Sequence, residues 1–276
     1  MPYKTILVHL NDLRRVEKML EPALYLAQRY NAHLIGLHVY PSVVAPPVPL
    51  PGGRYVAGTV HSFEREESDA IAAIFSSMTA NQPFVSEWRT LMAPLFELPS
   101  VVLEQARSTD LIIAGQADPS WDFSLMLDFP ERLALESGRP VLVIPYAGHC
   151  REIGRNVVIA WKPTREAARS VFDALPLLMN AERVHVIEVK HSASTSLMPD
   201  TSIAAALGRH GIKPTVHSAV QPDSGVGEEI LSRLADVGAD LLVMGAYGHS
   251  RFREYVLGGA TRHIAQHMTV ATLWSH

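Results

Sequence analysis

The stretch LLVMGAYGHSRFREYVLGGATRHIAQH, residues 241–267, joins an apolar run to a helical pattern through a glycine-containing connection. Its first four residues are all apolar, as expected for a strand that is buried on both faces of a parallel sheet. The helical pattern follows Gly258 and Gly259. The connection is longer than the roughly two to six residues usual between a strand and a helix. Extra length at such a place is typical of a ligand site, so this stretch predicts both the type of sheet and its binding end.

Short apolar runs alternate with longer amphipathic segments along the chain, which is the pattern of parallel strands joined by helical crossovers. The expected strands are residues 3–10, 32–40, 84–91, 110–115 and 139–145 in the first half, and 156–161, 183–189, 213–220, 240–246 and 270–274 in the second. The sequence therefore predicts an α/β protein with two tandem, Rossmann-like, five-stranded parallel sheets.

The two halves align as copies of one unit. Residues 6–10 match residues 157–161, and residues 110–115 match residues 240–245, with a longer interval between the matched segments in the first half. The extra residues fall around the proline-rich segment PSVVAPPVPLPGGRYVAG, residues 41–58, and the helix after it. This segment is either a lid or a detour. We interpret it as a detour, because proline-rich surface segments are common without function.

Polar residues mark the helix starts and the join between the halves. Asn11 and Asp12 precede one helical pattern, and Thr164 precedes the corresponding one in the second half, each with a side chain suited to an N-cap. The expected helices include residues 13–30, 59–81 and 165–178. The segment YAGHCREIGR is the expected linker between a first domain at residues 1–146 and a second at residues 155–276.

Composition excludes several classes of function. The chain has 276 residues, 47% of them hydrophobic and 19% charged, with a formal net charge of -4, so a broad cationic surface for nucleic acid or an anionic membrane is not expected. Met1 leads directly into a strand-like run without an apolar stretch of membrane-spanning length, which predicts a cytoplasmic protein. Cys150 is the single cysteine, which excludes an internal disulfide and a cysteine-built zinc site.

Glycine near a helix start suits an anion, because backbone N–H groups approach it without a Cβ in the way and the helix end carries partial positive charge. The spacing Gly245-x2-Gly248-x9-Gly258 resembles the nucleotide-binding signature of the universal stress protein family, G-x2-G-x9-G followed by Ser or Thr. The runs ILVHLND and VVIAWKPT also resemble the opening strand of that family. The resemblance covers nearly the whole chain and identifies it as a tandem two-domain member.

The resemblance implies the adenine nucleotide alpha hydrolase-like fold in each half. It also implies that the last strands of the two halves pair with each other, so that the halves pack as a pseudo-dimer. It implies binding of ATP or a related adenine nucleotide, with or without Mg²⁺, by some members and of no nucleotide by others. Carried over by position, the candidate binding residues are Ala160, Lys162, Val189, Met244, Gly245, Gly248, Arg251, Gly258, Gly259, Ala260 and Thr261. Of these, the resemblance implies that Val189 would face the base. Arg251 is a candidate because it lies early in the loop, where its guanidinium would either reach a terminal phosphate or remain solvated.

Two residues depart from the family pattern. Gly259 stands where the signature has Ser or Thr, which removes one side-chain donor but leaves the backbone N–H and the Thr261 hydroxyl. Lys162 stands where nucleotide binders place an aspartate that accepts from the adenine amino group, and an ammonium has no acceptor. Lys162 is left with two alternatives: attraction of phosphate or a bond to the opposite domain.

The first half lacks most of the signature. Its residues equivalent to Gly245, Gly248, Gly258, Gly259 and Thr261 are Gly115, Asp118, Asp128, Phe129 and Glu131. Carboxylates near a helix start are favourable for the helix and would repel a phosphate placed there. We therefore expect acidic side chains to occupy the first crevice, and at most one nucleotide per chain, bound in the second half.

Three other patterns have weaker functional interpretations. Ser250 lies in a segment similar to a nucleophile elbow, but Phe252 replaces the required second glycine. His263 and His267 have the i, i+4 spacing of zinc ligands, and a surface or interface pair is the favoured interpretation over a metal site. The segment SGVGEEI, residues 224–230, is interpreted as a helix start, since it lacks the third glycine of a dinucleotide fingerprint.

The leading hypothesis is a stress-response sensor or regulator without a dedicated catalytic apparatus, in which nucleotide binding biases a conformation or a partner surface. A nucleotide-free interaction scaffold is the second hypothesis. The third is a weak ATPase with Thr261, Lys162 and a loop cation around a metal-bound triphosphate. A homodimer is also expected, because an exposed sheet edge invites a second copy.

Overall fold

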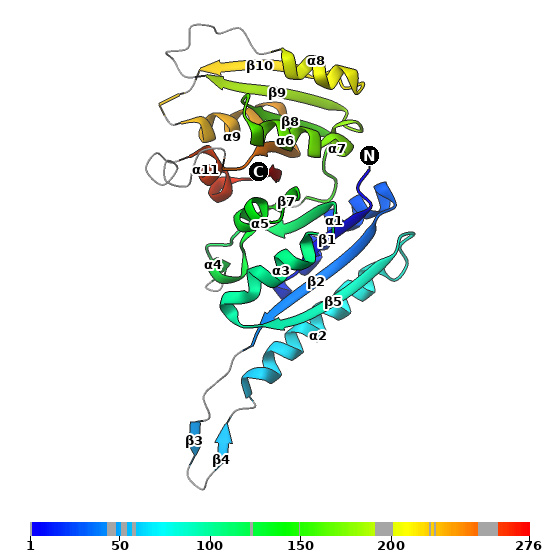
Figure 1. Cartoon of the computed structure of the whole chain (residues 1–276), viewed down its shortest axis with the longest axis vertical. Coiled ribbons are helices and arrows are strands. Elements are labelled where there is room, and N and C mark those ends of the chain that lie inside the picture. The colour runs from blue at the N-terminus through cyan, green and yellow to red at the C-terminus, as the bar shows by residue number, and fades with distance from the viewer. Residues whose placement is uncertain are drawn as a thin grey trace.

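A computed structural model describes residues 2–42, 48–50, 54–56, 59–121, 124–148, 150–190, 201–220, 222–223, 225–247 and 259–276. Ten strands form one continuous sheet in the order β10-β9-β8-β11-β12-β7-β6-β1-β2-β5 (Figure 1). The first five, in chain order, are β1 (Thr5–His9), β2 (His33–Pro41), β5 (Ser86–Ala93), β6 (Leu111–Gly115) and β7 (Val141–Ile144). The second five are β8 (Asn156–Trp161), β9 (Arg183–Lys190), β10 (Thr215–Val220), β11 (Leu241–Gly245) and β12 (Ala271–Ser275). Each coincides with a strand predicted from the sequence.

The two halves have the same strand order and meet edge to edge. Pairing within each half is parallel. At the centre β12 pairs with β7 in the antiparallel sense, with Thr272 opposite Val143 and Trp274 opposite Val141. Trp274 is fully buried at this junction. The expected pairing of the last strands is confirmed, and the chain is a tandem pseudo-dimer built around one sheet.

The burial of the strands explains why they could be predicted from apolar runs in the sequence. The central strands β6 and β7 are buried at every position. The outer strands β5 and β10 are mostly half-buried or exposed, because each has a neighbour on one side alone. Long apolar runs therefore mark the centre of the sheet, and mixed runs mark its edges.

Helices cover both faces of the sheet. One core cluster is formed with α1 (Val16–Tyr30), α2 (Thr59–Thr79), α6 (Arg165–Asp173), α7 (Leu175–Leu178) and α8 (Ser202–Arg209). The opposite cluster is formed with α3 (Leu98–Ala106), α5 (Pro130–Glu136), α9 (Val226–Val237) and α11 (Ala260–His267). No helix within the described segments is long and apolar enough to cross a bilayer.

The predicted helix starts are confirmed with two local differences. Asp12 accepts a hydrogen bond from the Arg14 N–H, but it caps a 3-10 turn, η1 (Leu13–Arg15), which leads into α1. Thr164 caps α6 by accepting from the Ala167 N–H at 3.4 Å. The single helix predicted at residues 165–178 is divided into α6 and α7, because Pro176 has no N–H to continue the ladder.

The insertion after β2 contains a structure that the sequence did not predict. β3 (Val48–Leu50) and β4 (Arg54–Val56) pair in the antiparallel sense as a separate two-stranded sheet. Figure 1 shows this hairpin standing away from the body of the first half, beyond the start of α2. Proline and glycine residues fit a hairpin here, since residues 51–53 between the strands are Pro-Gly-Gly.

Candidate functional site

The predicted site in the second half lies at the carboxyl ends of the central strands. Met244 on β11 is paired with Ala160 on the neighbouring strand β8. Val189 lies near the end of β9, the next strand along. All three contribute to the core cluster beneath α9 and α11. The structure therefore brings these candidates to one face and one end of the sheet, where parallel α/β sheets bind ligands.

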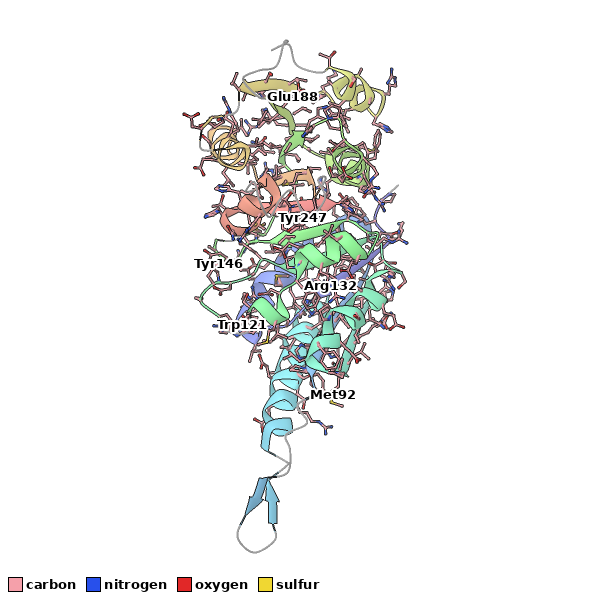
Figure 2. All side chains as sticks on the ribbon, turned by 60° about the vertical axis from the view of Figure 1, so that its left-hand side comes forward. Met92, Trp121, Arg132, Tyr146, Glu188 and Tyr247 are labelled. Carbon is pink, nitrogen blue, oxygen red and sulfur yellow. The ribbon has the colours of Figure 1, made fainter. Side chains whose placement is uncertain are left out.

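The start of α11 completes this end of the sheet. Gly259 is its N-cap in an extended conformation, and no side chain caps the helix. The Tyr247 N–H donates to the Thr261 hydroxyl at 3.4 Å, which ties the chain after β11 to the first turn of α11. Thr261 is buried, whereas Ala260 is partly exposed. Figure 2 shows Tyr247 at the level of the junction between the halves. The remaining loop candidates, Gly248, Ser250, Arg251, Phe252 and Gly258, lie outside the described residues.

Gly245 has a packing requirement that its place in the glycine signature does not reveal. A Cβ at this position would lie 2.5 Å from the backbone nitrogen of Ala167 and 2.6 Å from the carbonyl carbon of Glu166. Backbone atoms in the first turn of α6 are not free to move away, so only glycine fits. Close approach of α6 to β11 is thus sufficient to explain one of the three signature glycines.

Glu166 lies beside Gly245 and was not among the residues predicted for the site. Its side chain is about 10% exposed and pairs with the Arg165 guanidinium at 3.1 Å. Burial pushes the pKa of Glu166 upward, but the hydrogen bond from its own N–H and the nearby Arg165 and His276 outweigh burial, so its pKa lies below the ordinary value. A carboxylate is therefore maintained at the carboxyl ends of the strands of the second half, next to Gly245.

Two neighbours complete this polar cluster. His276 donates from Nδ1 to the Ala246 carbonyl oxygen at 2.9 Å and accepts at Nε2 from the Arg165 guanidinium at 3.4 Å. Lys162 is exposed between β8 and α6, and its carbonyl oxygen accepts from the Thr164 N–H at 2.7 Å. The predicted site in the second half therefore has both a retained carboxylate and an exposed ammonium nearby.

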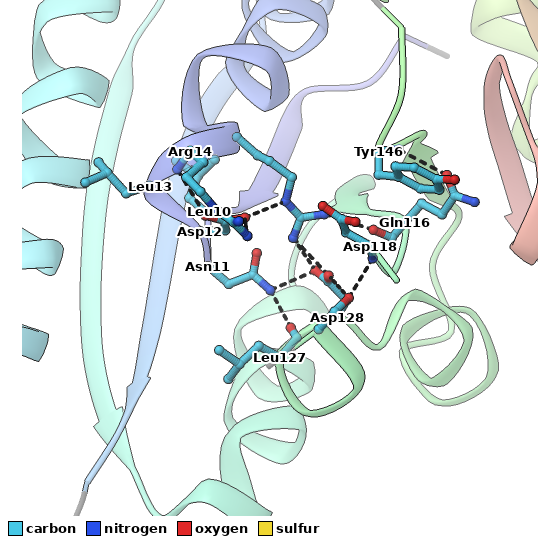
Figure 3. A network of polar contacts seen from close by, with 12 residues as sticks. Leu10, Asn11, Asp12, Leu13, Arg14, Gln116, Asp118, Leu127, Asp128 and Tyr146 are labelled. Carbon is cyan, nitrogen blue, oxygen red and sulfur yellow. Dashed lines mark hydrogen bonds and ion pairs between the residues drawn. The ribbon is translucent and has the colours of Figure 1, made fainter. Parts of the chain in front are cut away.

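The equivalent crevice of the first half is filled by an ion pair. Arg15 of η1 donates two hydrogen bonds of 2.9 Å to the Asp128 carboxylate and one of 3.0 Å to Asp12 (Figure 3). Its third nitrogen donates to the carbonyl oxygen of Gln116 at 2.9 Å. A Cβ on Gly115 would lie 3.2 Å from the Arg15 guanidinium, so this side chain occupies the space directly over the end of β6.

Further side chains secure the same pair. Asn11 donates from its amide to Asp128 at 2.9 Å and to the backbone carbonyl of Leu127. The Ser124 hydroxyl donates to Asp128 at 2.7 Å and accepts from the Asp118 N–H. The Trp121 ring lies 5.3 Å from the Arg15 guanidinium, within cation–π range. The Asp128 carboxylate is consequently held by three side chains from two distant parts of the chain.

The expectation that acidic side chains occupy this crevice agrees with the position of Asp128, but it overlooked Arg15. Asp118 lies at the more exposed rim. Burial raises the pKa of its carboxyl, but the hydrogen bonds from Ser120 and the charges of Arg15 and Arg14 outweigh burial, so this pKa lies below the ordinary value. Phe129 contacts the ring of the buried His9, with 5.3 Å between ring centroids, and Glu131 lies in the first turn of α5. Alignment of the two halves could have pointed to Arg15, because it aligns with Glu166 of the second half.

The remaining candidates have structural roles. His263 pairs with Glu228 at 3.1 Å and stacks on His267 with ring centroids 4.5 Å apart, at the contact between α9 and α11. A Cβ on Gly227 would meet His263 at 2.7 Å, so this glycine permits the contact, and its segment does begin a helix. No cluster of three or more potential metal ligands occurs among the residues that were placed.

Comparison with known proteins gives a consistent assignment. Residues 163–274 match the model of the universal stress protein family. A universal stress protein from Archaeoglobus fulgidus DSM 4304 has a TM-score of 0.74 and 14% identity, covering 98% of this chain and 95% of that chain. A functionally unknown protein from Pseudomonas aeruginosa PAO1 has a TM-score of 0.59 and 13% identity, covering 99% and 92%. A universal stress protein in complex with cAMP covers 53% of this chain and 100% of its own, at a TM-score of 0.32 and 21% identity. No curated protein matches the chain.

Proposed function

We propose, from the premise that residues 163–274 form a universal stress protein domain, that the second half binds an adenine nucleotide and acts as a sensor or regulator rather than as an enzyme. The start of α11 is the observation that carries this proposal. Its N-cap is Gly259, without a side-chain cap, and Thr261 in its first turn accepts from the Tyr247 N–H just after β11. The first N–H groups of such a helix attract anions, and phosphate is the natural guest.

The contrast between the halves supports one nucleotide per chain. In the first half the carboxylate of Asp128 and the guanidinium of Arg15 fill the crevice. In the second half the residue aligned with Asp128 is Gly258, which has no side chain to fill that space. A ligand anion would meet the α11 end there without a competing carboxylate from the same position.

Charge near the second site suggests an orientation for the ligand. The Glu166 carboxylate at the start of α6 repels phosphate, so the phosphates are proposed to lie at α11, away from α6. Lys162 is exposed at the end of β8 and provides a cation on the same rim. Mg²⁺ accompanying the triphosphate would offset the negative charge of the ligand and of Glu166.

The test is a thermal shift and calorimetric titration of the full chain with ATP, ADP and AMP. Ligand at about one hundred times its dissociation constant should stabilise the wild type by roughly 2.7 kcal/mol. Gly258→Asp copies the carboxylate of the first half and should abolish the shift. Gly208→Asp is the matched control, since Gly208 is exposed on α8 with open space around its Cβ position, and it should keep the shift.

Two further readouts separate the alternatives. Mass spectrometry of small molecules released from the denatured protein identifies a co-purifying nucleotide, and phosphate release above the Gly258→Asp level would indicate a weak ATPase. A nucleotide-free interaction protein is the second candidate, favoured by the packing requirement at Gly245, which keeps that glycine without any ligand. If no mononucleotide shifts the melting temperature of the wild type or gives a binding signal in calorimetry, the proposal is contradicted and this candidate is supported.

A further inference from the structure

Gln116 of the first half donates a hydrogen bond to the helix that carries the proposed site of the second half. Its side-chain Nε2 lies 2.8 Å from the carbonyl oxygen of Ala265 in α11. Gln116 directly follows β6 and is 2% exposed, so this contact is buried at the junction between the halves. Energetic coupling between distant sites is carried by packed, hydrogen-bonded contacts of this kind.

The orientation of the Gln116 amide is fixed by its two partners. The backbone N–H of Tyr146 donates to its Oε1 at 3.0 Å (Figure 3). Because an N–H group can only donate and a carbonyl oxygen can only accept, the opposite orientation of the amide would lose both bonds. The backbone is held as well, since the Gln116 N–H donates to the Ile144 carbonyl oxygen at 2.8 Å and its own carbonyl accepts from Arg15. The first half therefore keeps the donor in one position.

The carbonyl of Ala265 is one of those that the end of a helix leaves without a helical partner. In α11 the Met268 N–H donates to the Ile264 carbonyl oxygen at 2.9 Å, and the backbone is already extended at Met268. The Gln116 amide supplies a donor for the next carbonyl along the chain. Leaving a partly buried carbonyl without a donor is unfavourable, so this bond favours the position of α11 in which it can form.

Both ends of α11 are therefore held by groups outside the helix. At its start, the Thr261 hydroxyl accepts from the Tyr247 N–H at 3.4 Å. At its end, Ala265 accepts from Gln116. A helix of eight residues is about 12 Å long and transmits displacement as one rigid element. A shift at the end of α11 would consequently move the N–H groups at its start, where the phosphates are proposed to lie.

This contact has no counterpart in the opposite direction. The residue of the second half that corresponds to Gln116 is Ala246, which follows β11 as Gln116 follows β6. Each of the two donates its backbone N–H to the last strand of its own half. The methyl group of Ala246 cannot donate a hydrogen bond to the first half. The half whose crevice is filled by Arg15 and Asp128 therefore holds α11 without receiving the same contact in return.

We propose that Gln116 is a positioning residue through which the first half controls nucleotide affinity in the second, and this rests on the proposed function because it concerns the site at the start of α11. If the binding-competent position of α11 is populated for only a fraction of the time, the apparent dissociation constant rises by the inverse of that fraction. Loss of the Gln116 bond lowers the fraction. By reciprocity, a bound nucleotide strengthens the bond.

The first test is calorimetric titration of the full chain with ATP. Gln116→Leu removes the amide at nearly constant size and should raise the dissociation constant of ATP about fivefold or more. Thr109→Val is the matched control, because it removes a buried hydroxyl that donates to the Ala106 carbonyl oxygen at the end of α3. It takes the same kind of bond from a helix of the first half, so its affinity for ATP should equal that of the wild type.

The second test separates control of affinity from general stability. Hydrogen exchange at the Tyr146 N–H reports the Gln116 bond from within the first half. Saturating ATP should slow this exchange in the wild type and in Thr109→Val, but not in Gln116→Leu, which lacks the acceptor. A residue with a structural role alone would give the same exchange rate with and without nucleotide. The measurement on the wild type does not depend on the folding of any variant.

The outcomes distinguish this proposal from nucleotide binding itself. An unchanged dissociation constant in Gln116→Leu, or exchange at Tyr146 that ATP does not slow, overturns the role of Gln116 and leaves the nucleotide site intact, provided that Gly258→Asp abolishes binding. An equal loss of affinity in Thr109→Val also overturns it, because general destabilisation would then explain the result. A wild type that binds no mononucleotide overturns both proposals.

Discussion

Arg15 and Asp128, 113 residues apart in the chain, are joined by two hydrogen bonds of 2.9 Å, and their side chains are only 9% and 1% exposed. The second half replaces them by Glu166 and Gly258, which reverses one charge and removes the other. Two copies of one fold therefore treat the same crevice in opposite ways. The first half fills its crevice with its own side chains, whereas in the second half no side chain caps the start of α11.

Removing the guanidinium should destabilise the protein strongly. Arg15→Ala leaves Asp128 buried with fewer partners, and breaking a buried ion pair from one side costs about 3–5 kcal/mol. We expect a loss near the lower figure in urea unfolding, because Asn11 and Ser124 still donate to the carboxylate. Arg165→Ala serves as the exposed control and should cost less than about 1 kcal/mol.

The same pair can be tested for coupling. In the double variant Arg15→Ala with Asp128→Ala, the unpaired buried charge is gone. Its loss of stability should therefore be smaller than the sum of the two single losses by at least about 1 kcal/mol. Strict additivity would mean that the two side chains do not stabilise one another.

Gly245→Ala should lower the free energy of unfolding more than Gly115→Ala does. Gly245→Ala would drive a Cβ into the backbone of α6 at Glu166 and Ala167, and overpacking of this kind costs about 1–3 kcal/mol. Gly115→Ala meets a guanidinium at 3.2 Å, which is a flexible side chain able to shift. Thermal denaturation of the two variants compares them at equivalent positions. Equal losses would argue against the packing explanation.

Buried His9 should make stability fall in mild acid. Burial, with His38 and Arg15 nearby, lowers the pKa of His9 to about 3, well below the value of 6.5 in the unfolded chain. The unfolded chain therefore takes up this proton first, and the free energy of unfolding decreases as pH falls from 6.5 towards 3. One such group contributes about 1.4 kcal/mol per pH unit within that window.

The comparison of pH 7 with pH 5 isolates this effect from the carboxylates. Across that interval, His9 should account for about 2 kcal/mol of the wild-type loss. His9→Leu should lose correspondingly less, while His38, whose pKa burial also lowers, contributes in the same direction in both proteins. If the wild type and His9→Leu lose the same free energy of unfolding between pH 7 and pH 5, the His9 ring does not take up a proton on unfolding.

Lys162 should control selectivity for the base. Lys162→Asp restores an acceptor for the adenine amino group, so the affinity for ATP should rise relative to GTP by roughly tenfold or more. Lys162→Met tests the loss of positive charge alone, because its thioether is at most a weak acceptor. Calorimetry with both nucleotides measures the ratio. A constant ratio across the three proteins would place the base away from the end of β8.

The pairing of the last strands was expected from the family resemblance, whereas the ten strands and their order along the chain in two halves were predicted from the sequence by itself. These features follow from local periodicity and from a repeated pattern, because a strand buried on both faces must be apolar along its length. The caps at Asp12 and Thr164 were predictable for the same reason, since a cap acts on N–H groups two or three residues away.

Only the tertiary structure decided what fills each crevice and which surface faces outward. Arg15 meets Asp128 because η1 and α5 begin at the same end of the sheet, and Gly245 needs its missing Cβ because α6 approaches β11. Periodicity specifies which residues are buried, whereas contacts between distant residues depend on the geometry of the assembled sheet.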